Sequence, residues 1–191
     1  MDITDRRTDP TPAAGKLRLV NDEGKARILD SNGKRARLRA EAGTPVNAVA
    51  ATATLDPTGT NNSVLYTAKV AGAAGNTISV QYAISGGGSS VLSVDATGND
   101  ILVTAGSATT AATVISIVNS STASALVTAA ASGTVTGVIA AVAKTYLAGG
   151  VDATEGQGGD MLVDGTNIYM ATAEVTKSST SGWRKVAHSA L

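Results

Sequence analysis

The chain has 191 residues with no cysteine, no phenylalanine, one tryptophan and four tyrosines, and its formal net charge is zero. The absence of cysteine excludes disulfides and thiolate metal sites, and the length allows one ordinary domain with appendages or two small domains. Small side chains bury little apolar area each, so a core this poor in aromatic residues is expected to be only marginally stable by itself. We therefore expect partner subunits to supply part of the stability. Tight alanine packing and backbone pairing within one chain are the alternative.

The charges are unevenly distributed along the chain. Residues 1–42 hold ten of the fifteen Lys and Arg residues against seven acids, whereas residues 43–176 hold two Lys against eight acids. No apolar run follows the opening MDITDRRTDP, so no signal peptide is expected. The longest apolar run, around residues 138–143, is far too short to span a membrane. The sequence thus predicts a basic front, a mildly acidic body and no membrane partner.

Residues 1–43 are interpreted as an N-terminal arm. The first fifteen residues carry charges and two prolines without periodicity, which is typical of a flexible segment. A repeat then follows, with the units KLRLVNDEG, KARILDSNG and KRARLRAEAG. Apolar and basic residues alternate in each unit and NDEG and DSNG favour turns, so the repeat predicts three short strands with one apolar and one cationic edge. Because strands of this size do not bury a core alone, they should pair with a neighbouring chain or lie along a surface.

The cationic residues of this repeat and the single tryptophan are the candidate contacts with a partner protein or a sister subunit. They are Lys16, Arg18, Lys25, Arg27, Lys34, Arg35, Arg37, Arg39 and Trp183. Arg35, Arg37 and Arg39 alternate along one strand face, a geometry that fits phosphates. No aromatic residue is interleaved for base stacking, and acidic residues interrupt the patch. We therefore expect no nucleic-acid binding, and favour contact with an acidic protein surface or a solvated face.

Residues 44–61 are rich in Ala, Thr and Pro without a clear period, and predict a linker or extended connector. Residues 62–151 are predicted to form the core domain. Its first two strands, SVLYTAKV and NTISVQYAI, alternate with period two, which is typical of half-buried antiparallel strands. The residues expected to face inward are Val64, Tyr66, Ala68 and Val70, then Ile78, Val80, Tyr82 and Ile84. A wide or bulged turn at AGAAGN is expected between them, and two further strands should flank the turn DATGND.

One helix is predicted over SATTAATVISIVNS, with Ser107 or Thr109 as its cap. Its apolar stripe, which should lie on the sheet, consists of Ala111, Val114, Ile115 and Val118. ALVTA predicts another short strand. VIAAVAKTYLAGG fits a helix through its alanines and an extended segment through its flanking glycine-rich loops, and we favour the extended form. Residues 152–191 predict a small C-terminal β-hairpin unit of three strands, anchored by Trp183.

The predicted fold class is therefore α+β, a mainly antiparallel β domain with one packed helix. No catalytic set accompanies it: His188 is the single histidine and lacks a nucleophile elbow, and EGQGGDM fails the dinucleotide fingerprint. A hairpin turn explains Asp95, Asn99 and Asp100 better than a calcium site, whose ligand count they do not reach. Metal binding is also the less favoured interpretation of a looser acidic set, which consists of Asp152, Glu155, Asp160 and Asp164. We predict no catalytic, cofactor-binding or metal site, and no enzyme activity.

The sequence resembles a module of tailed-bacteriophage virion proteins over about residues 60–153. The residues that carry the resemblance are AGAAGNTISVQY, then DILVTAGSATTAATVISIVNSSTASALVTA and VIAAVAKTYLAGGVDA. Such modules are associated with head decoration and head-fibre proteins and with domains of tail sheath proteins. The segment GDMLVDGTNIYMATAEVTKSSTSGWRKVAHSAL is also similar to the ends of head-fibre proteins. A sheath protein would carry a much larger body around the module, which favours a small accessory virion protein.

The resemblance implies a structural virion protein without a cofactor, which decorates and stabilises the outer surface of a bacteriophage capsid by bridging capsid subunits. Its implied partners are the major capsid protein and sister subunits, as a homotrimer, and it would be made in the host cytoplasm. The alternative is a fibre or tail component that binds a host receptor or glycan, with Tyr169 and Trp183 stacking on sugar rings. For both of these side chains, packing in a core is the favoured role.

Overall fold

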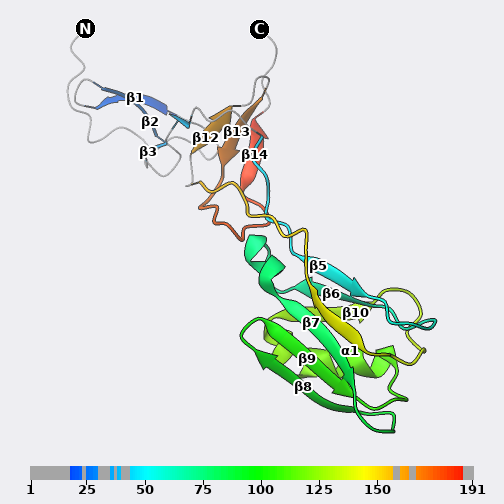
Figure 1. Ribbon diagram of the computed structural model, residues 1–191. Helices are drawn as coiled ribbons and strands as arrows, with labels where there is room; N and C mark the ends of the chain where they lie inside the picture. Colours follow the sequence, from blue (N-terminus) through cyan, green and yellow to red (C-terminus); the bar gives the residue numbers. More distant parts are fainter. Residues whose placement is uncertain are drawn as a thin grey trace. The chain divides into compact units, whose positions relative to one another are not determined.

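The computed structural model describes residues 18–22, 25–29, 35–36, 38–39, 44–156, 160–163 and 167–186, with the backbone alone before residue 44. Contacts divide the chain into two compact units (Figure 1). Ala48–Asp152 form the first, here the core unit, and Met1–Asn47 with Ala153–Leu191 form the second, here the terminal unit. Strands in antiparallel and mixed sheets dominate the described residues, together with one α-helix, so the predicted α+β class is confirmed.

The core unit contains two sheets, with the strand orders β10-β6-β5 and β11-β7-β9-β8. Their strands are β5 (Thr52–Leu55), β6 (Val64–Ala68), β7 (Ser79–Ile84), β8 (Val91–Thr97), β9 (Asp100–Ala105), β10 (Val127–Ala131) and β11 (Val142–Tyr146). The helices are α1 (Ala111–Ser120) and two short 3-10 segments, η1 (Ala73–Thr77) and η2 (Thr122–Ala125). The last apolar run thus forms the extended strand β11, as favoured from the sequence.

Period-two alternation sets the core as predicted, with two differences. Val64 and Tyr66 of β6 and Val80 and Tyr82 of β7 are all at most 1% exposed. Val70, predicted to face inward, is 62% exposed because β6 ends at Ala68 before reaching it. The second difference is pairing: β7 is antiparallel to β11 but parallel to β9, since β8 lies outside β9 in the sheet. Alternation shows which face of a strand is buried and not the direction of its neighbour.

Helix α1 begins one residue later than the predicted caps allow. Thr110 is the N-cap, and its hydroxyl accepts from the Thr113 amide at 3.4 Å. Thr109 is instead buried, and its hydroxyl donates to the Ser90 carbonyl at 2.9 Å. An isolated antiparallel bridge between Thr110 and Val138 keeps the chain extended up to the cap. The predicted stripe is confirmed, as Ala111, Val114 and Val118 are fully buried and Ile115 packs against the core.

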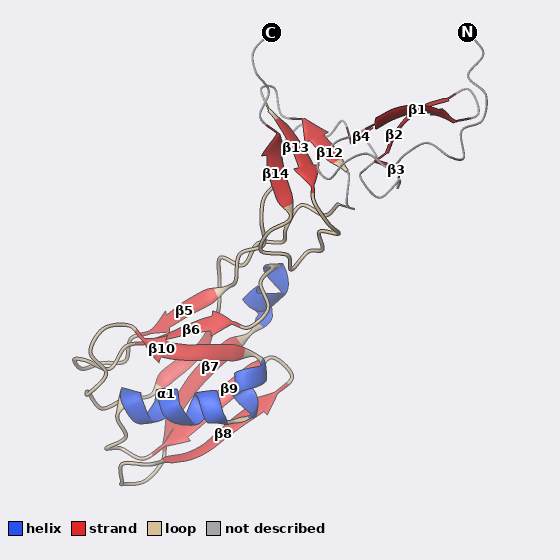
Figure 2. Ribbon diagram, turned by 180° about the vertical axis from the view of Figure 1, so that it is seen from behind, coloured by secondary structure: helices blue, strands red, loops and turns tan. Residues whose placement is uncertain are grey.

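The helix covers the end strands of both sheets. Both α1 and η2 contact β10 and β8, which are the outer strands of the two sheets (Figure 2). On the other side, Thr52 of β5 and Ala148, two residues beyond β11, exchange backbone hydrogen bonds of 2.8 and 2.9 Å. Two sheets joined at one side and bridged by a helix at the other surround one apolar core. Covered outer strands also protect the unit from edge-to-edge strand addition.

The expected connector at residues 44–61 contains part of the core. Thr52–Leu55 form β5, which pairs with β6, and Ala51 and Leu55 are 0% and 1% exposed. The expected turn at AGAAGN is the 3-10 segment η1, whose Gly75 lies against β5 and β6. A Cβ at Gly75 would lie 2.9 Å from the Cβ atoms of both Ala51 and Ala68. The small residues that obscure the period-two pattern in the sequence therefore also permit this close packing.

The terminal unit contains the predicted three-stranded C-terminal element, with β12 (Met161–Val163), β13 (Ile168–Ala171) and β14 (Trp183–Val186) in antiparallel order. The repeat forms β1 (Arg18–Asp22), β2 (Lys25–Leu29) and β3 (Arg35–Ala36) in an antiparallel sheet. The third repeat also contributes β4 (Leu38–Arg39), which pairs in parallel with β12. Three repeat units were predicted to give three strands, and the third unit gives two short ones instead.

Candidate interaction surfaces

The register of the repeat sheet sorts its residues onto two faces. Directly opposed residues in an antiparallel ladder share a face, and the opposed pairs are Arg18 with Leu29, Val20 with Arg27, Asp22 with Lys25, and Leu29 with Arg35. The positions of four cationic residues thus fall on one face, together with Val20, Leu29 and Asp22. The other face holds the positions of Leu19, Asn21, Ala26, Ile28 and Ala36. The backbone register therefore gathers the cationic positions on one face, as predicted, whereas the apolar positions are divided between the two faces.

The structure brings only some of the candidate contact residues together. Arg18, Lys25, Arg27 and Arg35 share the face just described, here the cationic face. Arg39 belongs to β4 and is paired with Leu162 in the other sheet of the terminal unit. Lys16, Lys34 and Arg37 lie outside the described residues, as does His188. Sequence alternation alone groups Arg35, Arg37 and Arg39, whereas the structure places Arg35 and Arg39 in two different sheets.

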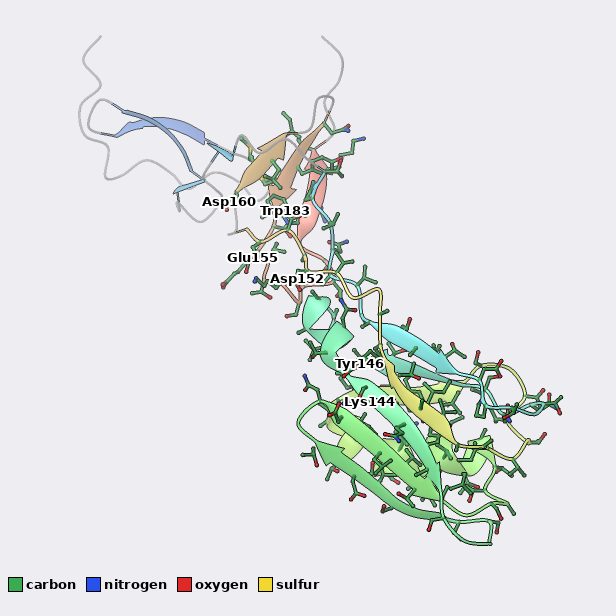
Figure 3. The ribbon with its side chains drawn as sticks, in the orientation of Figure 1. Lys144, Tyr146, Asp152, Glu155, Asp160 and Trp183 are labelled. Atoms are coloured by element: carbon green, nitrogen blue, oxygen red, sulfur yellow. The ribbon has the colours of Figure 1, made fainter. Side chains whose placement is uncertain are left out.

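Trp183 is tied into the terminal unit by two contacts. Its Nε1 donates to the Thr154 carbonyl at 2.7 Å. Its ring lies against Gly156, where an added Cβ would come within 2.6 Å of Cζ2. The tryptophan therefore fixes the chain at residues 154–156 to strand β14, consistent with the anchoring role expected of it (Figure 3). Its assignment as a partner contact stays a prediction.

A hollow of about 670 Å³ adjoins β14 in the same unit. Half of its lining residues are serine or threonine, and the lining includes Glu174 and Arg184, both of which are exposed. Exposed charges of both signs among serine and threonine hydroxyls are typical of a solvated loop surface.

The described residues of the predicted acidic set have different environments. Asp152 accepts a hydrogen bond from the Ala73 amide at 2.7 Å, Asp160 is 4% exposed, and Glu155 is exposed (Figure 3). Asp164 lies outside the described residues. Among the residues that the structure describes, no three His, Cys, Asp or Glu side chains gather as metal ligands. The turn DATGND is a two-residue hairpin in which Gly98 has a φ of 60° and Thr97 pairs with Asp100, so the hairpin interpretation is confirmed.

A polar constellation that sequence reasoning missed lies across β11, β7 and β9. The Lys144 Nζ is 2.7 Å from Asp100 Oδ1 and 5.3 Å from the centroid of the Tyr146 ring. The Ser79 hydroxyl donates to the same Asp100 oxygen at 2.6 Å. The hydrogen bond from Lys144, and then that from Ser79, lowers the pKa of the Asp100 carboxyl, and the bond to Asp100 raises the pKa of Lys144.

The aromatic residues differ sharply in exposure, although the chain has only five. Tyr66 and Tyr82 are buried, and Tyr169 and Trp183 are partly buried. Tyr146 is 55% exposed. The sequence indicates this placement only through Lys144-Thr145-Tyr146, because residues two apart in an extended segment share a face. Its partner Asp100 is 44 residues away, and no local pattern indicates that pairing.

Comparison with known proteins gives no match, whether to a family model, to a curated protein or to a solved structure. In the part of the chain that the structure describes, none of the helices has the length and apolar character needed to cross a membrane.

Proposed function

We propose that this protein is a structural virion protein that decorates the outer surface of a bacteriophage capsid and stabilises it by bridging capsid subunits. The observation that carries the proposal is the two-sided repeat sheet. Three strands of five, five and two residues cannot enclose a core. A sheet of this size with one cationic and one mostly apolar face gains stability by burying a face against another protein, which fits an attachment element.

The chemistry of the core unit supports a structural role. Residues 62–150 contain two Lys, two Asp and no Arg, His or Cys. One of the two lysines, Lys144, and one of the aspartates, Asp100, neutralise each other on the surface. A self-contained unit with covered outer strands and few reactive groups is suited to be a rigid knob, while the terminal unit makes the attachment.

The proposed mechanism is additive. The cationic face contacts an acidic surface of the major capsid protein, and sister subunits, as a homotrimer, occupy equivalent positions on the shell. Each contact is modest, but binding that favours the assembled shell over the dissociated subunits shifts the equilibrium toward assembly. Repetition by symmetry multiplies a small interface over many copies.

Charge reversal on the cationic face tests the proposal. The triple variant Arg18→Glu, Arg27→Glu, Arg35→Glu should lose binding to capsids that lack the protein, by about ten-fold or more at low salt. The matched control is Arg184→Glu with Lys185→Glu, which reverses two exposed cations of β14 outside the repeat. The control should bind as the unaltered protein does, and circular dichroism should show both variants folded. Equal binding by the triple variant and the unaltered protein would rule out this face as the attachment surface.

The alternative function, a fibre or tail component that binds a host receptor or glycan, predicts a different loss. Virions without a decoration protein should be less stable to heat and osmotic shock, yet still adsorb to cells. Virions that stay stable but no longer adsorb would favour the receptor function. For this second candidate, the exposed Tyr146 is better suited than Trp183 to stack on a sugar ring. The Nε1 and the ring of Trp183 both make contacts within the terminal unit.

A further inference from the structure

One face of the sheet β11-β7-β9-β8 is open to solvent over much of its area. The buried residues of its strands, such as Val80 and Val103, face α1 and the other sheet. The opposite face carries the intervening residues of each strand, which are mostly polar. The exposed ones include Lys144 and Tyr146 of β11, Gln81 of β7, Asp100 of β9, and Asp95 and Thr97 of β8, whereas Ser79 and Leu102 on the same face are buried and partly buried.

A β-bulge shapes this face beside Tyr146. Val142 pairs with Tyr82 and Thr145 with Val80, so β11 has one more residue than β7 between the two pairs. The extra residue leaves both Ala143 and Lys144 exposed. A bulge commonly re-aims a side chain at a functional surface. Here it places the Lys144 ammonium over the Tyr146 ring and within hydrogen-bonding distance of Asp100.

The two charges beside the exposed ring neutralise each other. Lys144 and Asp100 form an ion pair, and Ser79 holds the carboxylate from the other side. The remaining acid, Asp95, lies on β8 at the opposite edge of the sheet, where the Ser93 hydroxyl donates to it at 2.9 Å. A half-exposed aromatic ring thus stands among amide, hydroxyl, ammonium and carboxylate groups with no net charge. Such a surface is complementary to a neutral ligand rich in hydroxyls.

We propose that this surface, centred on Tyr146, binds a neutral saccharide. The apolar C–H face of a sugar ring stacks on Tyr146, since an aromatic ring presents a flat apolar surface. Lys144 donates to sugar hydroxyls, Asp100 accepts from them, and the exposed amide of Gln81 can do both. The site lies wholly in the core unit, so it is separate from the cationic face proposed for attachment.

The surroundings of Tyr146 favour a sugar over a protein partner. Aromatic anchors of protein interfaces sit in well-packed, fully desolvated pockets, and charged residues are depleted from interface centres. Tyr146 instead adjoins a lysine, an aspartate and a serine, and Leu102, an apolar position on the same face, is partly buried. Sugar sites combine an aromatic surface with a few well-placed polar groups.

The test is a titration of the isotope-labelled full chain with four neutral hexasaccharides: cellohexaose, maltohexaose, mannohexaose and hexa-N-acetylchitohexaose. At least one should give saturable amide shifts confined to β11, β7 and β9. Tyr146→Ala should weaken that binding by about ten-fold or more, and Tyr146→Phe should retain most of it because the ring remains. Val70→Ala, which alters a more exposed apolar residue elsewhere in the core unit, is the control and should change nothing.

Three results would overturn the proposal. One is the absence of saturable shifts on this face with all four sugars at millimolar concentrations. Another is preferential binding of an anionic oligosaccharide, hexagalacturonate, because the proposed site has no surplus positive charge. The third is loss of capsid binding by Tyr146→Ala without any sugar binding by the unaltered protein, which would assign the tyrosine to a protein contact. None of these results depends on the cationic face, whose variants test attachment separately.

Discussion

The hydroxyl groups of Tyr66 and Tyr82 lie 2.8 Å apart and form a hydrogen bond between the two sheets of the core unit. Tyr66 belongs to β6 of one sheet and Tyr82 to β7 of the other, and their rings meet edge to face with centroids 6.4 Å apart. Both side chains are almost completely buried. In a core built largely from alanine and valine, these two large side chains connect the layers.

A double-mutant cycle should detect this connection. Tyr66→Phe and Tyr82→Phe each remove one hydroxyl and leave the other buried without its partner, so each should lower the free energy of unfolding by about 1–3 kcal/mol. Replacing both removes the unsatisfied group as well, so the double variant should lose clearly less than the sum of the two single losses. Urea unfolding measures all four proteins. Strict additivity would show that the two hydroxyls do not interact.

The same pair should make the core unit sensitive to alkaline pH. Burial raises the pKa of both tyrosines, and in Tyr66 the neighbouring Tyr82 raises the pKa further. A group whose pKa is higher in the folded than in the unfolded state contributes stability that is complete below its unfolded pKa, about 10 for tyrosine, and is lost as the pH rises above it. Unfolding should therefore become easier above about pH 10.

Absorbance at the tyrosinate band and circular dichroism, followed together during an alkaline titration, check this expectation. Ionisation of the two buried tyrosines should coincide with loss of structure. The double Phe variant supplies the control, because its unfolding free energy should depend less on pH in this range. Equal alkaline sensitivity of the two proteins would contradict the account.

A single glycine should limit what the core tolerates. Gly75→Ala would add a methyl group 2.9 Å from the Cβ atoms of Ala51 and Ala68, so η1 would be forced away from β5 and β6. Overpacking of this kind costs about 1–3 kcal/mol. Gly87→Ala is the matched control, since nothing lies within 4 Å of its added Cβ. It should be neutral or slightly stabilising, and thermal unfolding would separate the two variants.

The surface ion pair should be visible as a pKa difference. The hydrogen bonds from Lys144 and Ser79 lower the pKa of Asp100, so the favourable interaction is present above the ordinary carboxyl pKa and is lost as the pH falls through the lowered one. In a carboxyl-detected NMR titration, Lys144→Met should raise the pKa of Asp100 more than Ser79→Ala does. An unchanged Asp100 pKa in Lys144→Met would show that the pair does not persist in solution. Because both groups are exposed, the effect on global stability should be small.

Local patterns predicted the elements of the core unit well. The alternation in β6 and β7 and the stripe of α1 identify many of the buried residues, because one face of each element must meet the core. The same patterns did not reveal β5, whose Ala and Thr residues resemble those of a connector. They also did not predict the parallel pairing of β7 with β9, which depends on where the chain returns rather than on which residues are apolar.

The interaction surfaces were predictable in part. Alternation in the repeat predicted that the cationic positions share one side, since period two holds within each strand and β1 pairs with β2 in a continuous register. The surface around Tyr146 was missed because it is assembled from three strands and depends on a bulge at residues 143–144. Each of its residues is unremarkable in its own segment. Their proximity is a property of the fold.

The central claim, attachment to the outside of a capsid, is tested most directly by electron cryomicroscopy of virions with and without this protein. The account predicts additional density on the outer surface of the head, spanning neighbouring capsid subunits, with the repeat sheet at the point of contact. That density should be absent from virions without the protein and should disappear with the triple charge-reversal variant. Density confined to the tail, or no difference on the head between the two kinds of virion, would contradict it.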